Sequence, residues 1–236
     1  MMNSEHTPLL RQRFERKFLI YPYSRSEAEM IIRLHPAAFS PIYQLRHVNN
    51  LYFDTPSLSF FYDNIYGSAN RKKFRIRWYG DLFGHLEHPV LEIKVKDGFV
   101  GRKLSFPLEP FDFDRGFTAA DTSVVFAQSA LPEWVRNELA SLQPSLLNTY
   151  QRSYYQSHDR KFRITIDDRL RYFEVLTLPN LFDRDRPADT EVVLELKYDF
   201  DHDDVAEEIT GQLPFRLIKN SKYINGILQF QPQMAL

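Results

Sequence analysis

The sequence predicts an α+β fold, mainly antiparallel β, in which the strands curl into a closed barrel with flanking helices. Five segments alternate charged and apolar residues with the two-residue period of a β-strand. The chain is also rich in Phe (20) and Tyr (13), bulky residues that favour strands. Helical patterns are few and short. The charged positions of the five segments are Arg13, Glu15 and Lys17; Arg75 and Arg77; Glu92, Lys94 and Lys96; Arg163 and Asp167; and Glu195 and Lys197.

The charged face of these strands is expected to line the inside of the barrel. An open sheet with its apolar face on a core and its charged face in water is the simpler alternative. However, solvent faces usually mix Ser, Thr, Asn and Gln with charges, whereas these faces hold almost only Arg, Lys and Glu. Arginine also suits bidentate contacts with phosphate. Because cations clustered in an interior are costly without a compensating anion, the pattern predicts a resident polyanion.

Carboxylates on the same faces predict a divalent metal ion beside that anion. Glu15, Glu92 and Glu195 offer the hard oxygen ligands that Mg²⁺ and Mn²⁺ prefer. The seven histidines are scattered without metal-ligand spacing, and no Walker A motif is present. The residues alone therefore predict an anion site with a metal ion, and they exclude a P-loop nucleotide site.

Four segments carry helix signals. Ser24 and Glu27 form a capping-box pattern ahead of an apolar stripe that ends before Pro36. Pro132 precedes a second apolar stripe, which includes Trp134. Residues 205–210 and 220–230 are predicted as two further short helices.

Composition limits the functional class. The formal net charge is −1, so no global field would draw the protein onto nucleic acid or an anionic membrane. The absence of cysteine excludes disulfides and thiolate chemistry. No signal peptide is recognisable, and no apolar run approaches the roughly 20 residues of a membrane span. We therefore expect a cytoplasmic protein with no nucleic-acid partner, in which a membrane link would need a membrane partner.

One domain is expected over residues 13–230, between an N-terminal tail at 1–12 and a C-terminal tail at 231–236. The stretches 107–122 and 179–190 interrupt the patterning with Pro, Asp and Gly or with polar residues. Neither has the length or composition of a domain linker, so both are predicted as loops. The oligomeric state is not readable from these patterns.

Several motifs, in a fixed order, give the sequence a resemblance to a known family. They are RFERKF at Arg13–Phe18, LYFDT at Leu51–Thr55, FRIRWYG at Phe74–Gly80, LEIKVK at Leu91–Lys96, YQRSYY at Tyr150–Tyr155, FRITIDD at Phe162–Asp168, LELKY at Leu194–Tyr198 and NSKY at Asn220–Tyr223. Each motif alone is weak, but the ordered set spans nearly the whole chain. It resembles the VTC polyphosphate polymerase domain, a branch of the triphosphate tunnel metalloenzyme (CYTH-like) superfamily.

The resemblance implies an eight-stranded antiparallel tunnel that binds triphosphate or polyphosphate along its axis. It also implies roles for individual residues. The phosphate-handling and catalytic positions would be Lys17, Arg75, Arg77, Lys94, Arg152, Arg163, Lys197 and Lys222, with Lys103, Lys219 and Ser221 as further ligands of the phosphates of ATP; Glu195 would bind the metal. The basic position that follows LEIK is matched equally by Arg102 and Lys103.

The implied activity is transfer of the ATP γ-phosphoryl group to a growing polyphosphate chain, with Mn²⁺ or Mg²⁺ as cofactor. Simpler triphosphatases of the superfamily begin with an ExExK strand, whereas Arg13 here replaces the first glutamate and leaves Glu15. The loss of that carboxylate favours polymerase over hydrolase chemistry. The acceptor phosphate is already an oxyanion, so no Ser, His or Cys nucleophile is required.

Other interpretations stay open at this point. The chain could be a tunnel hydrolase of triphosphates, or a polyphosphate-binding module without catalysis. Arg75 and Arg77 could face solvent, and Glu195 could pair with Lys197 without binding metal. Asp54 is expected to accept hydrogen bonds in a turn rather than to bind a ligand.

Overall fold

The computed structural model describes residues 13–98, 100–176, 182–188 and 192–234. The predicted tail at 1–12 lies outside these residues. The elements are β1 (Arg13–Leu19), α1 (Arg25–Leu34), β2 (Ser40–Asp54), α2 (Ser59–Ile65), β3 (Asn70–Tyr79), β4 (Gly84–Leu86), β5 (Val90–Asp97), β6 (Val100–Pro107), β7 (Phe111–Phe113), α3 (Ala119–Gln128), α4 (Glu133–Leu139), β8 (Gln143–Gln156), β9 (Arg163–Glu174), β10 (Asp185–Ala188), β11 (Val193–Asp199), α5 (Asp203–Gly211), β12 (Arg216–Leu217) and α6 (Lys222–Phe230), with short 3₁₀ turns at Phe200–His202 and Pro232–Met234.

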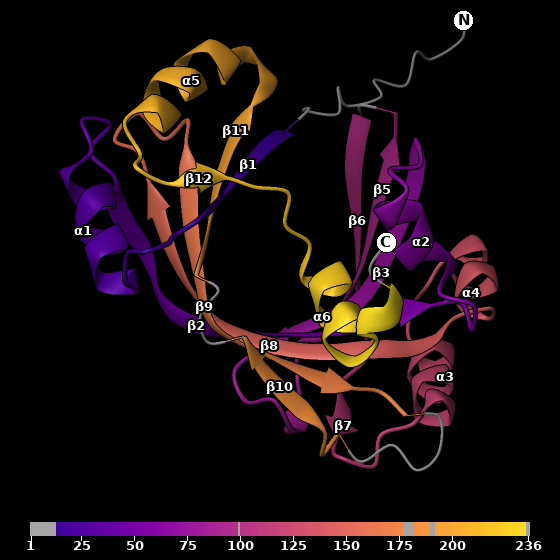
Figure 1. Cartoon of the computed structure of the whole chain (residues 1–236). Coiled ribbons are helices and arrows are strands. Elements are labelled where there is room, and N and C mark those ends of the chain that lie inside the picture. The colour runs from indigo at the N-terminus through magenta and orange to yellow at the C-terminus, as the bar shows by residue number, and fades with distance from the viewer. Residues whose placement is uncertain (1–12, 99, 177–181, 189–191, 235–236) are drawn as a thin grey trace, which may run out of the picture.

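Ten of the strands form one antiparallel sheet, and β4 and β7 form a separate pair. The order along the large sheet is β12-β1-β11-β9-β8-β2-β3-β5-β6, with β10 paired to β9. The sheet bends so strongly that β1 and β11 stand opposite β5 and β6, with β2 and β8 as the floor between them (Figure 1). The α+β class and the antiparallel sheet are confirmed.

The predicted closure into an eight-stranded barrel is not seen among the described residues, whose large sheet has ten strands. In the described part of the chain, no backbone ladder joins β6 to β1 or β12. The free edge strand β6 carries Arg102 and Lys103, both exposed, and charged side chains of this kind are typical of edges that stay unpaired. Instead of a ladder, the segment ahead of α6 links the walls, since Lys17 of β1 donates to the Asn220 carbonyl (2.9 Å) and Lys73 of β3 to Ser221 Oγ (2.9 Å).

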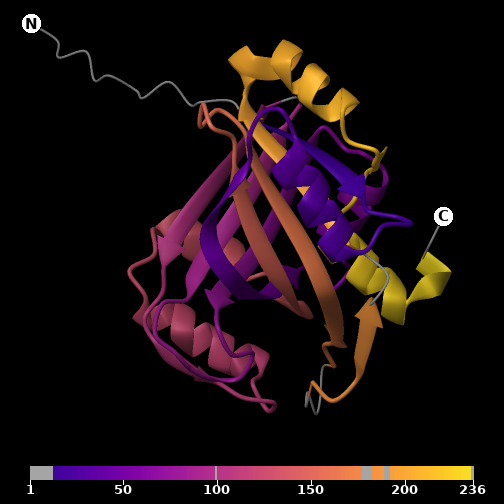
Figure 2. The same cartoon turned by 90° about the vertical axis from the view of Figure 1, so that its left-hand side faces the viewer.

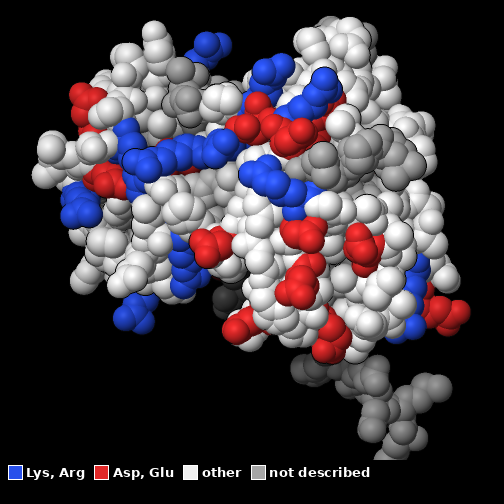
Figure 3. Space-filling model, turned by 90° about the horizontal axis from the view of Figure 1, so that it is seen from below, with Lys and Arg blue, Asp and Glu red and all other residues white. Residues whose placement is uncertain are grey.

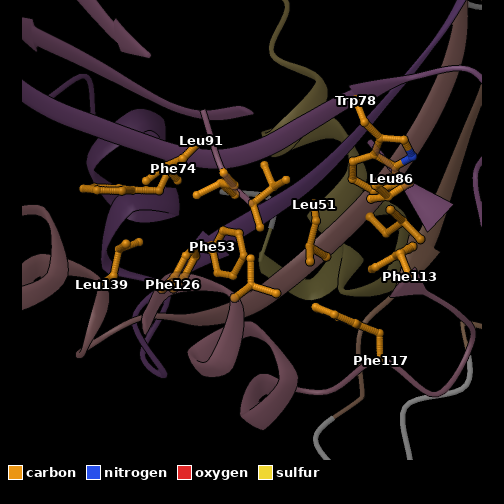
Figure 4. Close-up of a cluster of buried hydrophobic side chains, with 14 of the residues drawn as sticks. Leu51, Phe53, Phe74, Trp78, Leu86, Leu91, Phe113, Phe117, Phe126 and Leu139 are labelled. Atoms are coloured by element: carbon orange, nitrogen blue, oxygen red, sulfur yellow. The ribbon is translucent and has the colours of Figure 1, made fainter. Parts of the chain in front are cut away.

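The outer side of the sheet is covered in two places, because each strand presents an apolar face there. Residues Phe53, Phe74 and Leu91 pack with Phe126 of α3 and Leu139 of α4 (Figure 4). On the other wall, α1 and α5 cover the outer residues of β9 and β11 (Figure 2), where Ala28, Ile32 and Ala206 are completely buried. Burial of each such aromatic or aliphatic side chain contributes about 1.5–3 kcal/mol relative to exposure.

A third apolar cluster lies on the inner side of the floor, under α6 and α2. Tyr223 and Ile227 of α6 pack there on Leu146 and Tyr172. Asp54 anchors the same region, because its carboxylate accepts hydrogen bonds from the Phe60 and Phe61 backbone N–H groups (both 2.9 Å) and from the Tyr223 hydroxyl (2.5 Å). Its predicted structural role is confirmed.

The four predicted helices are present, with small differences. Ser24 caps α1 in a full capping box with Glu27, as predicted. Helix α4 follows Pro132, but Trp134 is 48% exposed, because Val135 and Leu139 occupy the core instead. Helices α2 and α3 were not predicted from the sequence pattern. Among the described residues, no helix has both the length and the apolar character needed to cross a membrane.

Substitution of Gly226 by alanine is expected to destabilise the fold. A Cβ at this position would lie 2.6 Å from Tyr172 Cδ1 and closer still to Leu146, so α6 would have to move away from the sheet. We expect a loss of about 1–3 kcal/mol in the free energy of unfolding, measured by urea denaturation. Gly211→Ala in α5 is the matched control, since open space surrounds its position and alanine favours a helix. Equal stability of the two variants would contradict the close packing of α6.

Candidate functional site

The side of the large sheet that faces the opposite wall carries most of the charged positions singled out in the sequence, and we call it the inner face. The pairing register explains this. Tyr52 lies opposite Arg75, which lies opposite Glu92, so the three side chains leave β2, β3 and β5 on one side of the sheet. Lys17 and Glu195 are likewise paired across β1 and β11. The charged face is therefore the enclosed face, as predicted.

Two arginines of β3 share one carboxylate of β5. Arg75 donates from Nε and Nη2 to Glu92 Oε2 (2.8 and 2.5 Å), and Arg77 Nη1 lies 3.5 Å from the same oxygen. Lys103 Nζ donates to Glu92 Oε1 (2.7 Å). Burial alone would raise the pKa of Glu92, but the charges of Arg75, Arg77 and Lys103 overcome it and hold that pKa well below its usual range. Glu92 is therefore an ionised partner that fixes three cations in place.

A second carboxylate joins β8, β9 and α6. Arg152 forms a bidentate pair with Asp167, through Nε to Oδ1 (2.5 Å) and Nη2 to Oδ2 (2.6 Å). Lys222 Nζ also donates to Asp167 Oδ2 (2.5 Å), so the first residue of α6 is tied to the sheet. Burial opposes ionisation of Asp167, yet Arg152 and Lys222 lower its pKa.

A third group lies on the wall formed by β1 and β11. Lys17 Nζ is 2.9 Å from Glu15 Oε1 and 3.4 Å from Glu195 Oε1. Lys197 Nζ is 2.9 Å from Glu195 Oε2 and 3.7 Å from Glu15 Oε2. Arg152 Nη2, 3.5 Å from Glu195, connects this group to the previous one. Burial raises the pKa of Glu195, but Lys197, Lys17 and Arg152 hold it well below the usual value.

Two lysines of the opposite wall lack such compensation. Burial lowers the pKa of Lys94 to about 7, with partial opposition from Glu15. The pKa of Lys73 also falls to about 7, through burial and through repulsion by Lys17, Arg75 and Arg71. The influence of Glu15 and Lys17 on these lysines shows that β1 and the β3–β5 wall face each other closely. Lys94 is nevertheless solvent-accessible, so water reaches the space between the walls.

Two buried polar atoms of the described inner-face residues have no hydrogen-bond partner. They are Asn148 Nδ2, on the floor, and Thr165 Oγ1, on β9 between Glu195 and Tyr154. Unpaired buried donors of this kind are uncommon in proteins and call for a water, ion or ligand.

The remaining predicted site residues lie at the edges of the inner face. Arg163 is exposed beside Lys197 in the sheet register, and Lys219 is exposed ahead of α6. Ser221 caps α6 and accepts from Lys73. Of the two candidates that follow LEIK, Lys103 is paired with Lys94 and contacts Glu92, whereas Arg102 belongs to the other side of the strand.

Sequence reasoning missed three residues of the inner face. Lys73 continues the alternation of Arg75 and Arg77, and this signal could have identified it. Asp167 was recognised as a charged strand position but not as the partner of Lys222, because a contact across 55 residues has no local signature. Tyr150 accepts from Arg77 (3.4 Å) and lies under Lys222, with Nζ 4.7 Å from the ring centroid.

The carboxylates fit a divalent metal that is only partly bound by protein. Glu15 and Glu195 share two lysines and so lie close together, whereas Glu92 lies with the arginines of the opposite wall. Within the described ranges, no group of three or more His, Asp or Glu side chains has the geometry to hold a metal ion. Two carboxylates suffice for Mg²⁺, which retains waters and binds substrate phosphates. The metal roles of Glu15, Glu92 and Glu195 stay predictions.

The outer surface has a different charge character. On the face seen from below the view of Figure 1, basic side chains form a row and acidic side chains gather in separate groups (Figure 3). Exposed pairs such as Arg171–Asp185 (2.5 Å) and Arg184–Glu174 (3.1 Å) join β9 to β10 and the segment before it. Such pairs contribute at most about 1 kcal/mol each. The overall charge of −1 therefore conceals the cationic excess of the inner face.

Comparisons with known proteins agree with this architecture. The sequence profile described as VTC domain matches residues 1–231. A candidate adenylate cyclase from Vibrio parahaemolyticus has a similar fold, with a TM-score of 0.52, 12% identity and coverage of 91% of this chain and 98% of that one. A candidate adenylyl cyclase from Hippeastrum, reported to have a dominant triphosphatase activity, is also similar in fold. Its TM-score is 0.51 at 13% identity, with coverage of 96% of this chain and 98% of that one. None of the curated proteins matches the chain.

Removal of the Lys73 charge is expected to stabilise the ligand-free protein near neutral pH. The folded-state pKa of about 7 lies below the unfolded value of 10.5, so folding disfavours the protonated lysine. This penalty is complete below pH 7 and disappears as the pH rises toward 10.5. In chemical denaturation, Lys73→Met should exceed the wild type in stability at pH 6.5 and lose this advantage by pH 10.

The matched control is Lys96→Met, an exposed lysine two residues beyond Lys94 on β5. It should change stability little, and by the same amount at both pH values. A pH-independent effect of Lys73→Met would contradict the repulsion among the cations of the inner face.

Proposed function

Because the chain belongs to the VTC domain family, we propose that it is a polyphosphate polymerase, which transfers the ATP γ-phosphoryl group onto a growing polyphosphate chain along the inner face. The observation that carries this proposal is the convergence of basic side chains from separate elements. Lys17, Lys73, Arg75, Lys94, Arg152 and Lys222 come from β1, β3, β5, β8 and α6 and meet on one enclosed face.

The electrostatics support a polyanionic ligand. The inner face carries more basic than acidic side chains, and Lys73 and Lys94 both have a pKa near 7 through burial and through repulsion by other cations, of which Arg75 acts on both. A chain of phosphates would supply the missing negative charge and raise the pKa values of Lys73 and Lys94. A neutral or cationic substrate would do none of this.

Phosphoryl transfer asks the protein chiefly for positioning and charge neutralisation. Arg75 and Arg77 would hold phosphate oxygens on one wall, while Arg152 and Lys222 would hold them on the floor. Lys17 and Lys197, on the opposite wall, would complete the enclosure and bring donor and acceptor into line. The acceptor is a terminal phosphate oxygen that already carries its charge, so no side chain has to remove a proton from it.

Two carboxylates beside this lysine pair are the residues that would hold a divalent ion. Glu15 and Glu195 would hold Mg²⁺ or Mn²⁺, leaving its other positions to water and phosphate oxygens. When bound, the ion neutralises charge on the transferring phosphate. Lys17 and Lys197 each contact both carboxylates, so the two lysines and the ion would share these oxygens.

Substitution of Arg75 by alanine should lower the rate of polymer synthesis by about 10³-fold, the lower end of the effect of a phosphate-clamping arginine. Arg77 and Lys103 still neutralise Glu92 in this variant, so the fold should persist. The assay is synthesis of acid-labile polymer and ADP from ATP with Mn²⁺, and EDTA should abolish it. Arg171→Ala, on the outer surface, is the matched control and should retain full activity.

The same assay distinguishes other activities of this site. Release of orthophosphate without polymer would make the protein a triphosphate hydrolase. Tight binding of polyphosphate without turnover, unaffected by Glu195→Gln, would make it a binding module. Retention of full synthesis by Arg75→Ala would refute the role of the inner face.

A further inference from the structure

Three tyrosines surround an arginine at one end of the inner face. The guanidinium carbon of Arg46 lies 4.3 Å from the ring centroid of Tyr43 and 5.5 Å from those of Tyr79 and Tyr154. The rings of Tyr43 and Tyr154 meet edge to face, with centroids 5.3 Å apart. We call Tyr43, Arg46, Tyr79 and Tyr154 the tyrosine cluster.

The sheet register places the tyrosine cluster on the same face as the phosphate-holding residues. Tyr43 is paired with Tyr154, and Arg46 with Arg152. Tyr79 is the next position on this face after Arg77, and Tyr154 the next after Arg152. Residues two apart in a strand are spaced by roughly 7 Å, so the cluster begins one side chain beyond the proposed phosphate site.

An irregularity in β2 creates this arrangement. Tyr43 and Arg46 are three residues apart, which in a regular strand would direct them to opposite faces. The register of β2 against β8 shifts between them, and a bulge of this kind re-aims a side chain. Bulges are enriched next to functional sites. Arg46 shares the regular alternation of Val48 and Asn50, so without the irregularity Tyr43 would leave the inner face.

The tyrosine cluster is accessible and has unused binding capacity. Tyr43 is 48% and Tyr79 is 52% exposed. Arg46 forms no ion pair with any described carboxylate, in contrast to Arg75 and Arg152. Exposed aromatic rings and a guanidinium without an ion pair among the described residues favour a planar aromatic ligand.

We propose that the tyrosine cluster binds the nucleobase of a nucleoside triphosphate whose phosphates lie on the inner face. This proposal rests on the function proposed above and adds where the nucleoside lies and which end of the inner face it occupies. The base stacks on the exposed ring of Tyr79, and Arg46 offers the base its planar guanidinium and its N–H donors. Inorganic polyphosphate, which has no base, gains nothing from the rings.

The test compares ATP with inorganic tripolyphosphate as ligands of the full chain, by calorimetry. Tyr79→Leu should weaken ATP binding roughly tenfold, the effect of one lost stacking partner, and change tripolyphosphate binding less than twofold. Tyr79→Trp should preserve ATP binding, which separates stacking from a structural role. The matched control is Tyr66→Leu, at an exposed tyrosine that follows α2, and it should affect neither ligand.

Three results would overturn the proposal. If wild-type protein binds tripolyphosphate and Tyr79→Leu leaves ATP binding unchanged, the nucleobase site is refuted while the proposed function survives. Equal weakening of both ligands by Tyr79→Leu would refute it as well. If the wild type binds neither ligand, the proposed function itself fails, and the nucleobase site with it.

Discussion

The structure depends on holding many like charges on one enclosed face. Each carboxylate of the inner face forms ion pairs with more than one cation. Glu92, for example, pairs with Arg75, Arg77 and Lys103. Asp167 likewise joins Arg152 to Lys222 and thereby anchors α6. Removing such a carboxylate would leave buried cations unpaired, which is far more destabilising than losing a surface pair. The carboxylates therefore stabilise the fold in addition to any part in metal binding.

This charge arrangement sets the rest of the architecture. The strands of the two walls place charged side chains on the inner face. Their apolar side chains therefore form the core on the outer side, where α1, α5, α3 and α4 cover the sheet. The floor is the exception, since α6 and α2 bury an apolar cluster on the inner side there. Helix α6 thus has two functions: its apolar residues close the floor, and its first residue brings Lys222 to the anion site.

The sequence predicted the parts of this structure that have a local signature. Alternation identified β1, β3, β5, β9 and β11, and a capping box identified α1. Motif order pointed to Lys17, Arg75, Arg152 and Lys222, which the fold brings together. Closure of the barrel had no such local basis, because pairing between β6 and β1 is a long-range property with no local pattern. Arg163 shares the alternation of the inner strands but lies exposed at their end, since alternation determines the face of a residue and not its depth.

The carboxylates also explain how this face could bind phosphate without first reorganising. A free lysine or arginine side chain loses rotamer freedom on binding, a cost of about 0.5–1.5 kcal/mol for each immobilised side chain. Here Glu92 already fixes the Arg75 fork with two N–H groups on one oxygen, and Asp167 holds Arg152 through a bidentate pair. Arg75 and Arg152 therefore lose most of their rotamer freedom when the protein folds, and little more when phosphate binds. Lys73 and Lys94 lack such a carboxylate partner, and their depressed pKa makes them the residues that respond most to an incoming polyanion. The paired arginines would therefore set the position of the phosphates, and the two lysines would supply charge as the phosphates arrive.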